Sequence, residues 1–166
     1  MKYRTLKKCL TLQWSDEIRR DMKDMFGTLC ALTQRISRLD DDHFIAIATG
    51  HGGTYLGNII PLSQSVNCSK NDANPFEWIR TRTDIDANRF ADVVAYLADL
   101  NGLTFDEYRQ FVDWCYANSR TIDEIKRDNE RYGYVVSSLE LWRESTGIAF
   151  PIRIDFGNHE RKEAAS

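Results

Sequence analysis

The second half of the chain carries the hydrophobic spacing of amphipathic helices. Within residues 86–102 the apolar positions recur every three or four residues, as on one helix face. They are Phe90, Val93, Val94, Leu97 and Leu100. Two later segments, 104–118 and 121–133, begin with a Thr followed three residues later by a Glu, which is the sequence of a capping box. Together with residues 137–147, these segments predict a helical C-terminal region.

The first half is less regular and predicts a mixture of strands, loops and short helices. Residues 30–48 look extended, with β-branched positions in their second part, and suggest a β-hairpin. Residues 49–58 hold four glycines and indicate a loop. The other expected elements are a helix over 15–27 that Ser15 caps and Gly27 ends, a short strand over 59–63, helices that begin within 64–70 and 74–82, and a late strand over 150–157.

These elements predict an α+β fold in one domain of 166 residues. We expect a basic N-terminal arm and helix over 1–28, a small mixed core over 29–82, and a helical region over 83–166 that packs on this core. Four aromatic side chains fall at helical apolar spacing and are expected in the hydrophobic core rather than as stacking platforms for bases. They are Trp78, Tyr96, Phe111 and Trp114.

Composition and charge narrow the class of protein. Hydrophobic residues make up 42% of the chain, which is enough for a core, and the apolar runs are too short to span a bilayer. Neither a signal peptide nor a CxxC pair is visible, so we expect a soluble cytoplasmic protein with free thiols. The net charge is −3, yet residues 1–38 hold nine Lys or Arg against four Asp or Glu. A basic arm of this kind suits a polyanion, although a solvated helix face explains it equally well.

The stretch "LDDDH" places three carboxylates beside an imidazole. Asp42 is a good oxygen ligand for a hard divalent cation, and a neutral His43 is a natural base for deprotonating water. Neighbours on a strand point to opposite faces, but at a strand end they can converge on one site. Asn58 and Asn67 follow at the end of the glycine loop and in the next predicted helix. Asp40 and Asp41 are expected in a turn, and a surface turn explains the Asp-His pair as well.

The order of these residues resembles the HNH endonuclease family, whose fold is the ββα-metal core. The resemblance covers roughly residues 28–80. It comprises "DH", a glycine loop, "NIIPLS", "VNCSK" and "NPFEW" in that order. Many members flank this motif with two CxxC pairs that bind zinc. Here the matching places read Cys30 with Thr33 and Ser63 with Val66, so no structural zinc is expected.

The resemblance implies a role for each matched residue. Asp42 and Asn67 would hold one Mg²⁺ or Mn²⁺, which would bind the phosphate and the leaving 3′ oxygen. His43 would be the general base, and Asn58 would fix the loop and help to hold His43. The implied reaction is hydrolysis of DNA phosphodiester bonds to 5′-phosphate and 3′-hydroxyl ends.

Five further residues are candidates for DNA contacts. Lys70 at the predicted helix could reach a phosphate, as could His51 in the glycine loop, while Arg80 and Arg82 could grip the backbone. Arg89 belongs with these arginines. The alternatives are a solvated lysine, a loop histidine bonded to backbone, and a charged helix surface.

Two other functions are open from the sequence. One is a non-catalytic DNA- or protein-binding module that retains the ββα fold. The other is a thiol enzyme that pairs Cys30 or Cys68 with His43 or His51, for which no orienting group is visible. The nuclease reading implies DNA as partner, a bacterial or phage setting, and a homodimer if both strands are cut.

Overall fold

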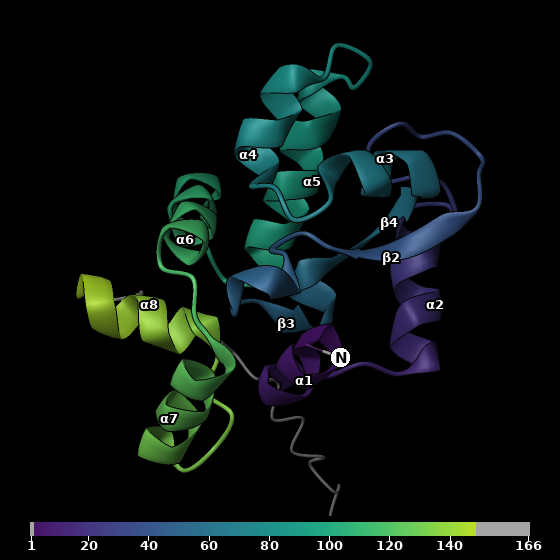
Figure 1. Ribbon diagram of the computed structural model, residues 1–166. Coiled ribbons are helices and arrows are strands. Elements are labelled where there is room, and N and C mark those ends of the chain that lie inside the picture. Colours follow the sequence, from purple (N-terminus) through teal and green to yellow (C-terminus); the bar gives the residue numbers. More distant parts are fainter. Residues whose placement is uncertain (1, 149–166) are drawn as a thin grey trace, which may run out of the picture.

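The computed structural model describes residues 2–148 and has an α+β architecture (Figure 1). Within these residues, none of the helices combines the length and apolar character needed to cross a membrane. Along the chain the elements are α1 (Lys2–Cys9), β1 (Thr11–Leu12), α2 (Asp16–Met25), β2 (Leu39–His43), η1 (Ile47–Thr49), β3 (Gly53–Thr54), η2 (Leu56–Asn58), β4 (Ile59–Ser63), α3 (Gln64–Lys70), α4 (Pro75–Trp78), η3 (Ile79–Thr81), α5 (Ala87–Leu100), α6 (Phe105–Ala117), α7 (Ile122–Tyr132) and α8 (Ser138–Thr146).

An antiparallel pair of strands, β2 and β4, lies between α2 and α3, and α3 follows β4 directly (Figure 1). In this pair Asp42 lies opposite Ile60 and His43 opposite Ile59. All five residues of β4 are buried, which matches its apolar sequence. A second, parallel pair of two-residue strands, β1 and β3, joins the N-terminal segment to the glycine loop. The site residues of β2 are therefore held by pairing to a buried strand.

The β-hairpin expected over residues 30–48 was wrong in most of its length. Only Leu39–His43 forms a strand, and Gln34 in the expected first arm has φ +54°, which a strand does not allow. The apolar run that begins at Phe44 leaves the sheet for the core, and Ile47–Thr49 is a 3₁₀ turn. The polar half of the segment pairs as a strand because helices on both sides supply partners for its carboxylates.

The helical C-terminal region was predicted correctly. α5 to α8 occupy the expected segments, and Thr104 and Thr121 form complete capping boxes with the Glu three residues on. Ser137 adds a third capping box at α8. Ser15 caps α2 as expected, whereas α1 was not foreseen as a helix. The expected strand over 150–157 lies outside the described residues.

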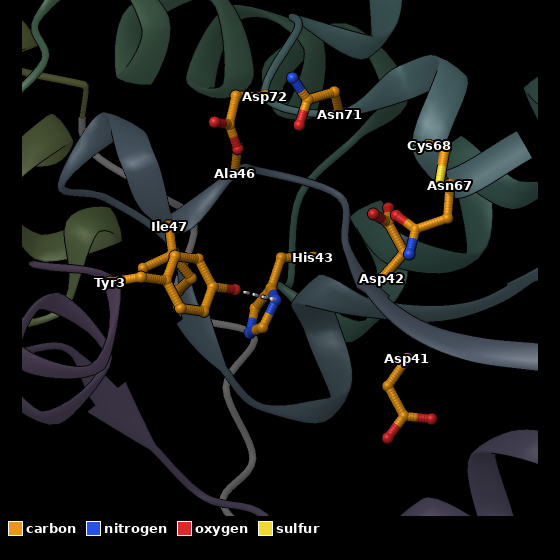
Figure 2. Close-up of a pocket in the computed structure, with 10 residues that line it drawn as sticks. All are labelled: Tyr3, Asp41, Asp42, His43, Ala46, Ile47, Asn67, Cys68, Asn71 and Asp72. Carbon is orange, nitrogen blue, oxygen red and sulfur yellow. Dashed lines mark hydrogen bonds between the residues drawn. The ribbon is translucent and has the colours of Figure 1, made fainter. Parts of the chain in front are cut away.

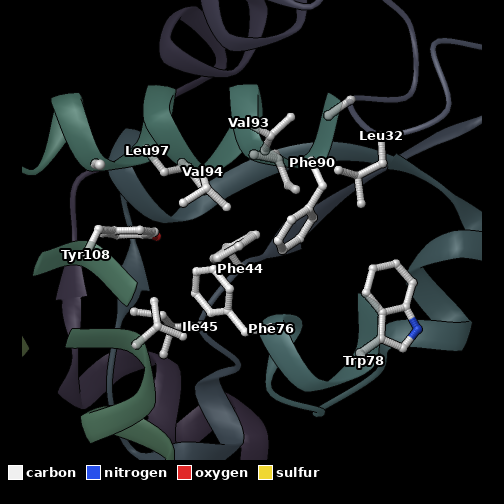
Figure 3. Packing of buried hydrophobic residues seen from close by; sticks show 14 of the residues in the cluster. Leu32, Phe44, Ile45, Phe76, Trp78, Phe90, Val93, Val94, Leu97 and Tyr108 are labelled. Carbon is white, nitrogen blue, oxygen red and sulfur yellow. The ribbon is translucent and has the colours of Figure 1, made fainter. Parts of the chain in front are cut away.

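The hydrophobic core joins the strand pair to the C-terminal helices. Phe44, from the end of β2, packs against Phe76, Phe90 and Tyr108, with ring centroids 6.0–6.2 Å away (Figure 3). Full burial of such side chains contributes about 1.5–3 kcal/mol each. Of the four aromatic residues expected in the core, two are buried and two are partly buried against it. These are Trp78 and Phe111, and Tyr96 and Trp114, respectively.

All four cysteines are free thiols. Cys30 lies beside Thr33 and Ser63, two of the residues at the places where many HNH members have zinc-binding cysteines. Burial raises the pKa of the Cys30 thiol, but hydrogen bonds from the Thr33 side chain and from the backbone of Ser63 outweigh it, so the pKa is lowered. Hydrogen bonds among these residues thus join the turn after α2 to the end of β4.

Candidate functional site

The three aspartates of β2 are each paired with a different partner. On one face of the strand, Asp40 accepts a hydrogen bond of 3.2 Å from Asn67 Nδ2 of α3. On the other face, Asp41 forms an ion pair of 2.5 Å with Arg19 of α2. Because these residues lie on a strand and not in a turn, the turn expected for Asp40 and Asp41 was wrong. The alternation of side chains along the strand distributes the three negative charges between two helices.

Asp42 forms a buried ion pair with Lys70 of α3. Lys70 Nζ lies 3.1 Å from Asp42 Oδ2, and the two side chains are only 1% and 6% exposed. Burial raises the pKa of Asp42 to about 6, although the Lys70 charge opposes this shift. Lys70 also donates to the backbone carbonyl of His43, at 3.1 Å. The phosphate contact expected of Lys70 was therefore wrong, because its ammonium is buried inside the protein.

The imidazole of His43 is held between two hydroxyl groups. Its Nε2 lies 2.9 Å from Thr54 Oγ1 in β3, and its Nδ1 lies 3.3 Å from the Tyr3 hydroxyl in α1. Burial, and then the nearby charges of Lys7 and Lys70, lower the pKa of His43 to about 4. The ring is therefore neutral at pH 7. If Nε2 donates its proton to Thr54, the lone pair of Nδ1 is left to accept a proton.

Asn58 fixes the loop that surrounds His43. Its Oδ1 accepts from the Ile45 backbone N–H at 2.8 Å, and its Nδ2 donates to the carbonyls of Ile45 and Gly53. The Asn58 backbone carbonyl also accepts from Phe44 N–H. Asn58 is fully buried, and these hydrogen bonds connect the segment that follows β2 to β3. It acts on His43 through these backbone contacts and not through the ring.

Asp42, His43 and Asn67 line one hollow of about 280 Å³ between β2, α3 and α1 (Figure 2). Tyr3 and Asp72 contribute to its walls. Figure 2 shows the His43 ring facing the Tyr3 hydroxyl, with the Asp42 and Asn67 side chains on the other side of His43. The strand end thus brings Asp42 and His43 to one site, although neighbours on a strand point to opposite faces.

Asp42 and Asn67 are the residues of this hollow whose side-chain oxygens could hold a hard divalent cation. Within residues 2–148, the buried Asp42 Oδ2 has Lys70 Nζ at 3.1 Å as an ion-pair partner but no donor with full hydrogen-bond geometry, and the carboxylates of Asp72 and Asp40 are also near enough to raise the Asp42 pKa. An oxygen from Asp42 and one from Asn67 would leave the remaining positions to water and phosphate, as magnesium prefers. Within the described chain, residues 2–148, no group of three His, Cys, Asp or Glu side chains is arranged to bind a metal.

His51 is fully buried in the glycine loop and holds α8 in place. Its Nε2 donates to the Asn118 carbonyl at 2.7 Å, so its Nδ1 accepts from Ser138 Oγ at 3.1 Å. The phosphate contact expected of His51 was therefore wrong, since both ring nitrogens have internal partners and the side chain is inaccessible. The pKa of His51 is lowered to about 4, chiefly by burial.

The arginines expected to grip DNA lie around α4 and α5. Arg80 is exposed and pairs with Glu77, while Arg82 pairs with Asp84 at 2.6 Å. Arg89 donates to the Ala31 carbonyl at 2.6 Å. None of these three residues lines the hollow that contains His43. Their role in binding DNA stays a prediction.

Sequence reasoning missed three features of the site. Tyr3 lies 40 positions before His43, and no pattern links the two residues. Thr54 lies in the glycine loop, and its hydroxyl could have been predicted from the sequence as a group that orients His43. The partner of Asp42 was also missed, because Lys70 was expected at the surface rather than in a buried ion pair.

Comparison with known proteins gave no matching family model, curated protein or solved structure. The residues of the hollow are therefore the basis for a functional assignment.

Proposed function

We propose that the protein is a metal-dependent endonuclease of the HNH class that hydrolyses DNA phosphodiester bonds. One observation carries this proposal: Asp42, His43 and Asn67 line the same hollow, at the end of an antiparallel strand pair that is followed by a helix. An antiparallel strand pair followed by a helix, as β2, β4 and α3 form, is compatible with a ββα-metal core. The sequence resemblance selects Asp42, His43 and Asn67, and their placement at one hollow supports the proposal.

In this proposal His43 is the general base. Its lowered pKa keeps the ring neutral, and the Thr54 hydroxyl orients it so that Nδ1 could take a proton from a water that replaces the Tyr3 hydroxyl contact at 3.3 Å. Asp42 and Asn67 would hold the Mg²⁺ or Mn²⁺, which when bound neutralises charge that develops on the phosphate. Asn58 keeps the loop in place. Water thus loses its proton to a base held in one orientation.

Cleavage of supercoiled plasmid tests the proposal. Purified protein with Mg²⁺ or Mn²⁺ should nick or linearise the DNA and leave 5′-phosphate ends, and EDTA should stop the reaction. His43→Ala should lower the rate by about 10²–10⁴-fold, as expected for loss of a general base. Arg109→Ala, an exposed substitution on α6, should keep full activity. A loss confined to His43→Ala would then exclude a contaminating nuclease as the source of cleavage. Full activity of a folded His43→Ala protein would end the assignment of His43 as base.

A second candidate is a non-catalytic DNA- or protein-binding module. The observation that favours it is the ammonium of Lys70, which already stands beside Asp42 where a metal would add positive charge. Titration of Mg²⁺ and Mn²⁺ by calorimetry separates the two candidates. Binding that Asn67→Ala weakens supports the nuclease, whereas absence of both binding and cleavage supports the module.

Double-strand cleavage would need two chains if each chain cuts one strand. The proposed partner is then DNA together with a second copy of the protein, in a bacterial or phage-infected cytoplasm. Sedimentation velocity with and without a DNA fragment measures whether a homodimer forms.

A further inference from the structure

A second hollow of about 480 Å³ lies beside the first and shares Tyr3, Asp41 and His43 with it. The hollow continues from His43 toward the N-terminal helices, which supply Lys7 from α1 and Arg19 and Lys23 from α2; Trp14, just before α2, completes this wall. We call it the N-terminal groove. Three cationic side chains and the carboxylates of Asp40 and Asp41 line this groove, which begins at the proposed catalytic residue.

Two cations of this groove hold one carboxylate. Arg19 contacts Asp41 Oδ2 through both Nε and Nη2 at 2.5 Å, and Lys23 Nζ lies 3.8 Å from Asp41 Oδ1. The Arg19 side chain is nonetheless 47% exposed. A guanidinium and a nearby ammonium that hold a carboxylate oxygen can also hold a phosphate oxygen. Asp41 therefore occupies the place that a phosphate would take.

The indole of Trp14 is one aromatic member of the groove, which Tyr3 and His43 also line. Trp14 precedes Ser15, the N-cap of α2, and is half-buried. The helix residue that would contact it in a hydrophobic staple is Arg19, which is charged. An aromatic ring among basic side chains in one groove is the arrangement that binds single-stranded nucleic acid, with phosphates on the cations and bases on the ring.

We propose that the N-terminal groove binds a single-stranded nucleic-acid segment next to the phosphodiester at His43. A backbone phosphate replaces the Asp41 carboxylate on Arg19 and Lys23, and an unpaired base stacks on Trp14. The placement beside a scissile phosphate rests on the proposed function, whereas the binding itself does not. The preference for an unpaired strand follows from Trp14, because bases in a duplex have both faces covered.

Fluorescence anisotropy in EDTA tests the groove without metal or cleavage. The probes are a fluorescein-labelled mixed-sequence oligonucleotide without self-complementarity and its duplex, at several salt concentrations. We expect tighter binding of the single strand, and a roughly tenfold loss with Trp14→Ala. Arg19→Ala should weaken binding and lower the salt slope by about 0.7. Asp41→Asn should strengthen binding, because the two cations are then released for phosphate.

Arg19→Ala and Asp41→Asn should change the affinity for the single strand in opposite directions, which separates a binding role from a structural one. A merely structural Arg19–Asp41 pair would make Arg19→Ala and Asp41→Asn change the affinity in the same direction, which would overturn the proposal. Lys23→Ala removes the second cation near Asp41 and should also weaken binding to the N-terminal groove. The matched control is Arg109→Ala with Asp113→Asn, since Arg109 is also 47% exposed and faces a carboxylate on α6. This pair should leave the salt slope unchanged.

The outcomes also distinguish this proposal from the nuclease assignment. Single-strand binding that depends on Arg19 and Trp14, in a protein that cuts no DNA, supports the groove and ends the nuclease assignment. Cleavage that is unaffected by Arg19→Ala and Trp14→Ala supports the nuclease assignment and overturns the proposal for the groove. Equal affinity for duplex and single strand, or no binding of either probe, overturns the groove.

Discussion

Lys70 and Asp42 form an ion pair of 3.1 Å whose side chains are almost completely buried. Lys70 ends α3 and Asp42 lies one residue before the end of β2, so the pair joins the two elements that carry Asn67 and His43. Burial still raises the pKa of Asp42 to about 6, which means that desolvation of the carboxylate outweighs the attraction of Lys70. A buried charge of this kind is costly once its partner is removed.

Replacement of Lys70 by Met should lower the free energy of unfolding by about 3–5 kcal/mol at pH 7. The substitution keeps the volume of the side chain but leaves the Asp42 carboxylate buried without a counterion. Urea denaturation measures the loss. The double variant Lys70→Met with Asp42→Asn should regain part of it, because the uncompensated charge is gone.

The exposed pair of Arg131 and Glu144 is the comparison for this substitution, since both side chains are about half exposed. Arg131→Met should cost no more than about 1 kcal/mol. A loss of the same small size for Lys70→Met would show that water reaches Asp42 and that the pair is not a buried one.

The parts of the fold that the sequence predicted are those with local signals. Capping residues such as Thr104 and Thr121 mark helix starts within a few residues of sequence, and the structure has them in place. The partners of the site come instead from distant segments. Tyr3 reaches His43 across 40 residues and Lys70 reaches Asp42 across 28, so no local spacing encodes them. The strand Leu39–His43 lies within the hairpin expected over residues 30–48, but its limits and its pairing with β4 were not predicted, for the same reason.

Substitution of Gly52 by Ala tests how tightly the glycine loop fits around Asn58. Gly52 has φ +70°, and a Cβ there would lie 2.6 Å from Asn58 Nδ2. The left-handed conformation costs Ala about 1–2 kcal/mol, and displacement of Asn58 from its buried hydrogen bonds adds about 1–3 kcal/mol. Thermal and urea denaturation of the variant measure the sum.

Gly133→Ala is the matched control for the loop. Gly133 ends α7 with φ +77°, and within the described chain nothing lies within 4 Å of a Cβ at this position. It should show the conformational cost alone. Equal losses for the two variants would mean that Asn58 yields to the added methyl group without losing its contacts.

His51 should lower the stability of the protein as the pH drops from about 6.5 to about 4, whereas Asp42, with its raised pKa, should oppose the fall. The unfolded chain takes up a proton on His51 near pH 6.5, whereas burial lowers the pKa in the folded protein to about 4. Folding therefore excludes a proton in this interval, at a cost of roughly 3 kcal/mol by pH 4. The Asn118 carbonyl and Asp128 oppose the shift, and Arg120 adds to it.

Urea denaturation of the wild type and of His51→Asn across this pH range isolates the contribution of His51. The variant should be less stable at pH 7, because it loses the contact with Ser138, but its stability should depend less on pH. His43 titrates similarly in both proteins and cancels in the difference. If the stabilities of the wild type and of His51→Asn changed equally with pH, the lowered pKa assigned to His51 would be wrong.

Thr54 should act as a positioning residue for His43. Its hydroxyl is buried and lies 2.9 Å from His43 Nε2, so it can keep the proton on Nε2 and leave Nδ1 as the base. Thr54→Val preserves the shape but removes this acceptor. If the protein is a nuclease, we expect the cleavage rate to fall by about 10–100-fold, as for loss of a residue that orients a site. Thr54→Ser should retain most of the activity.

Nitrogen-15 NMR of the His43 ring separates positioning from a general loss of structure. In the wild type the proton should reside on Nε2, and in Thr54→Val it should distribute over both ring nitrogens. Thr49→Val is the control, because Thr49 is a buried threonine of the same part of the chain whose hydroxyl donates to Ala46. It should leave the His43 tautomer unchanged. An unchanged tautomer in Thr54→Val, together with full activity, would show that the Tyr3 hydroxyl or the loop backbone orients the ring instead.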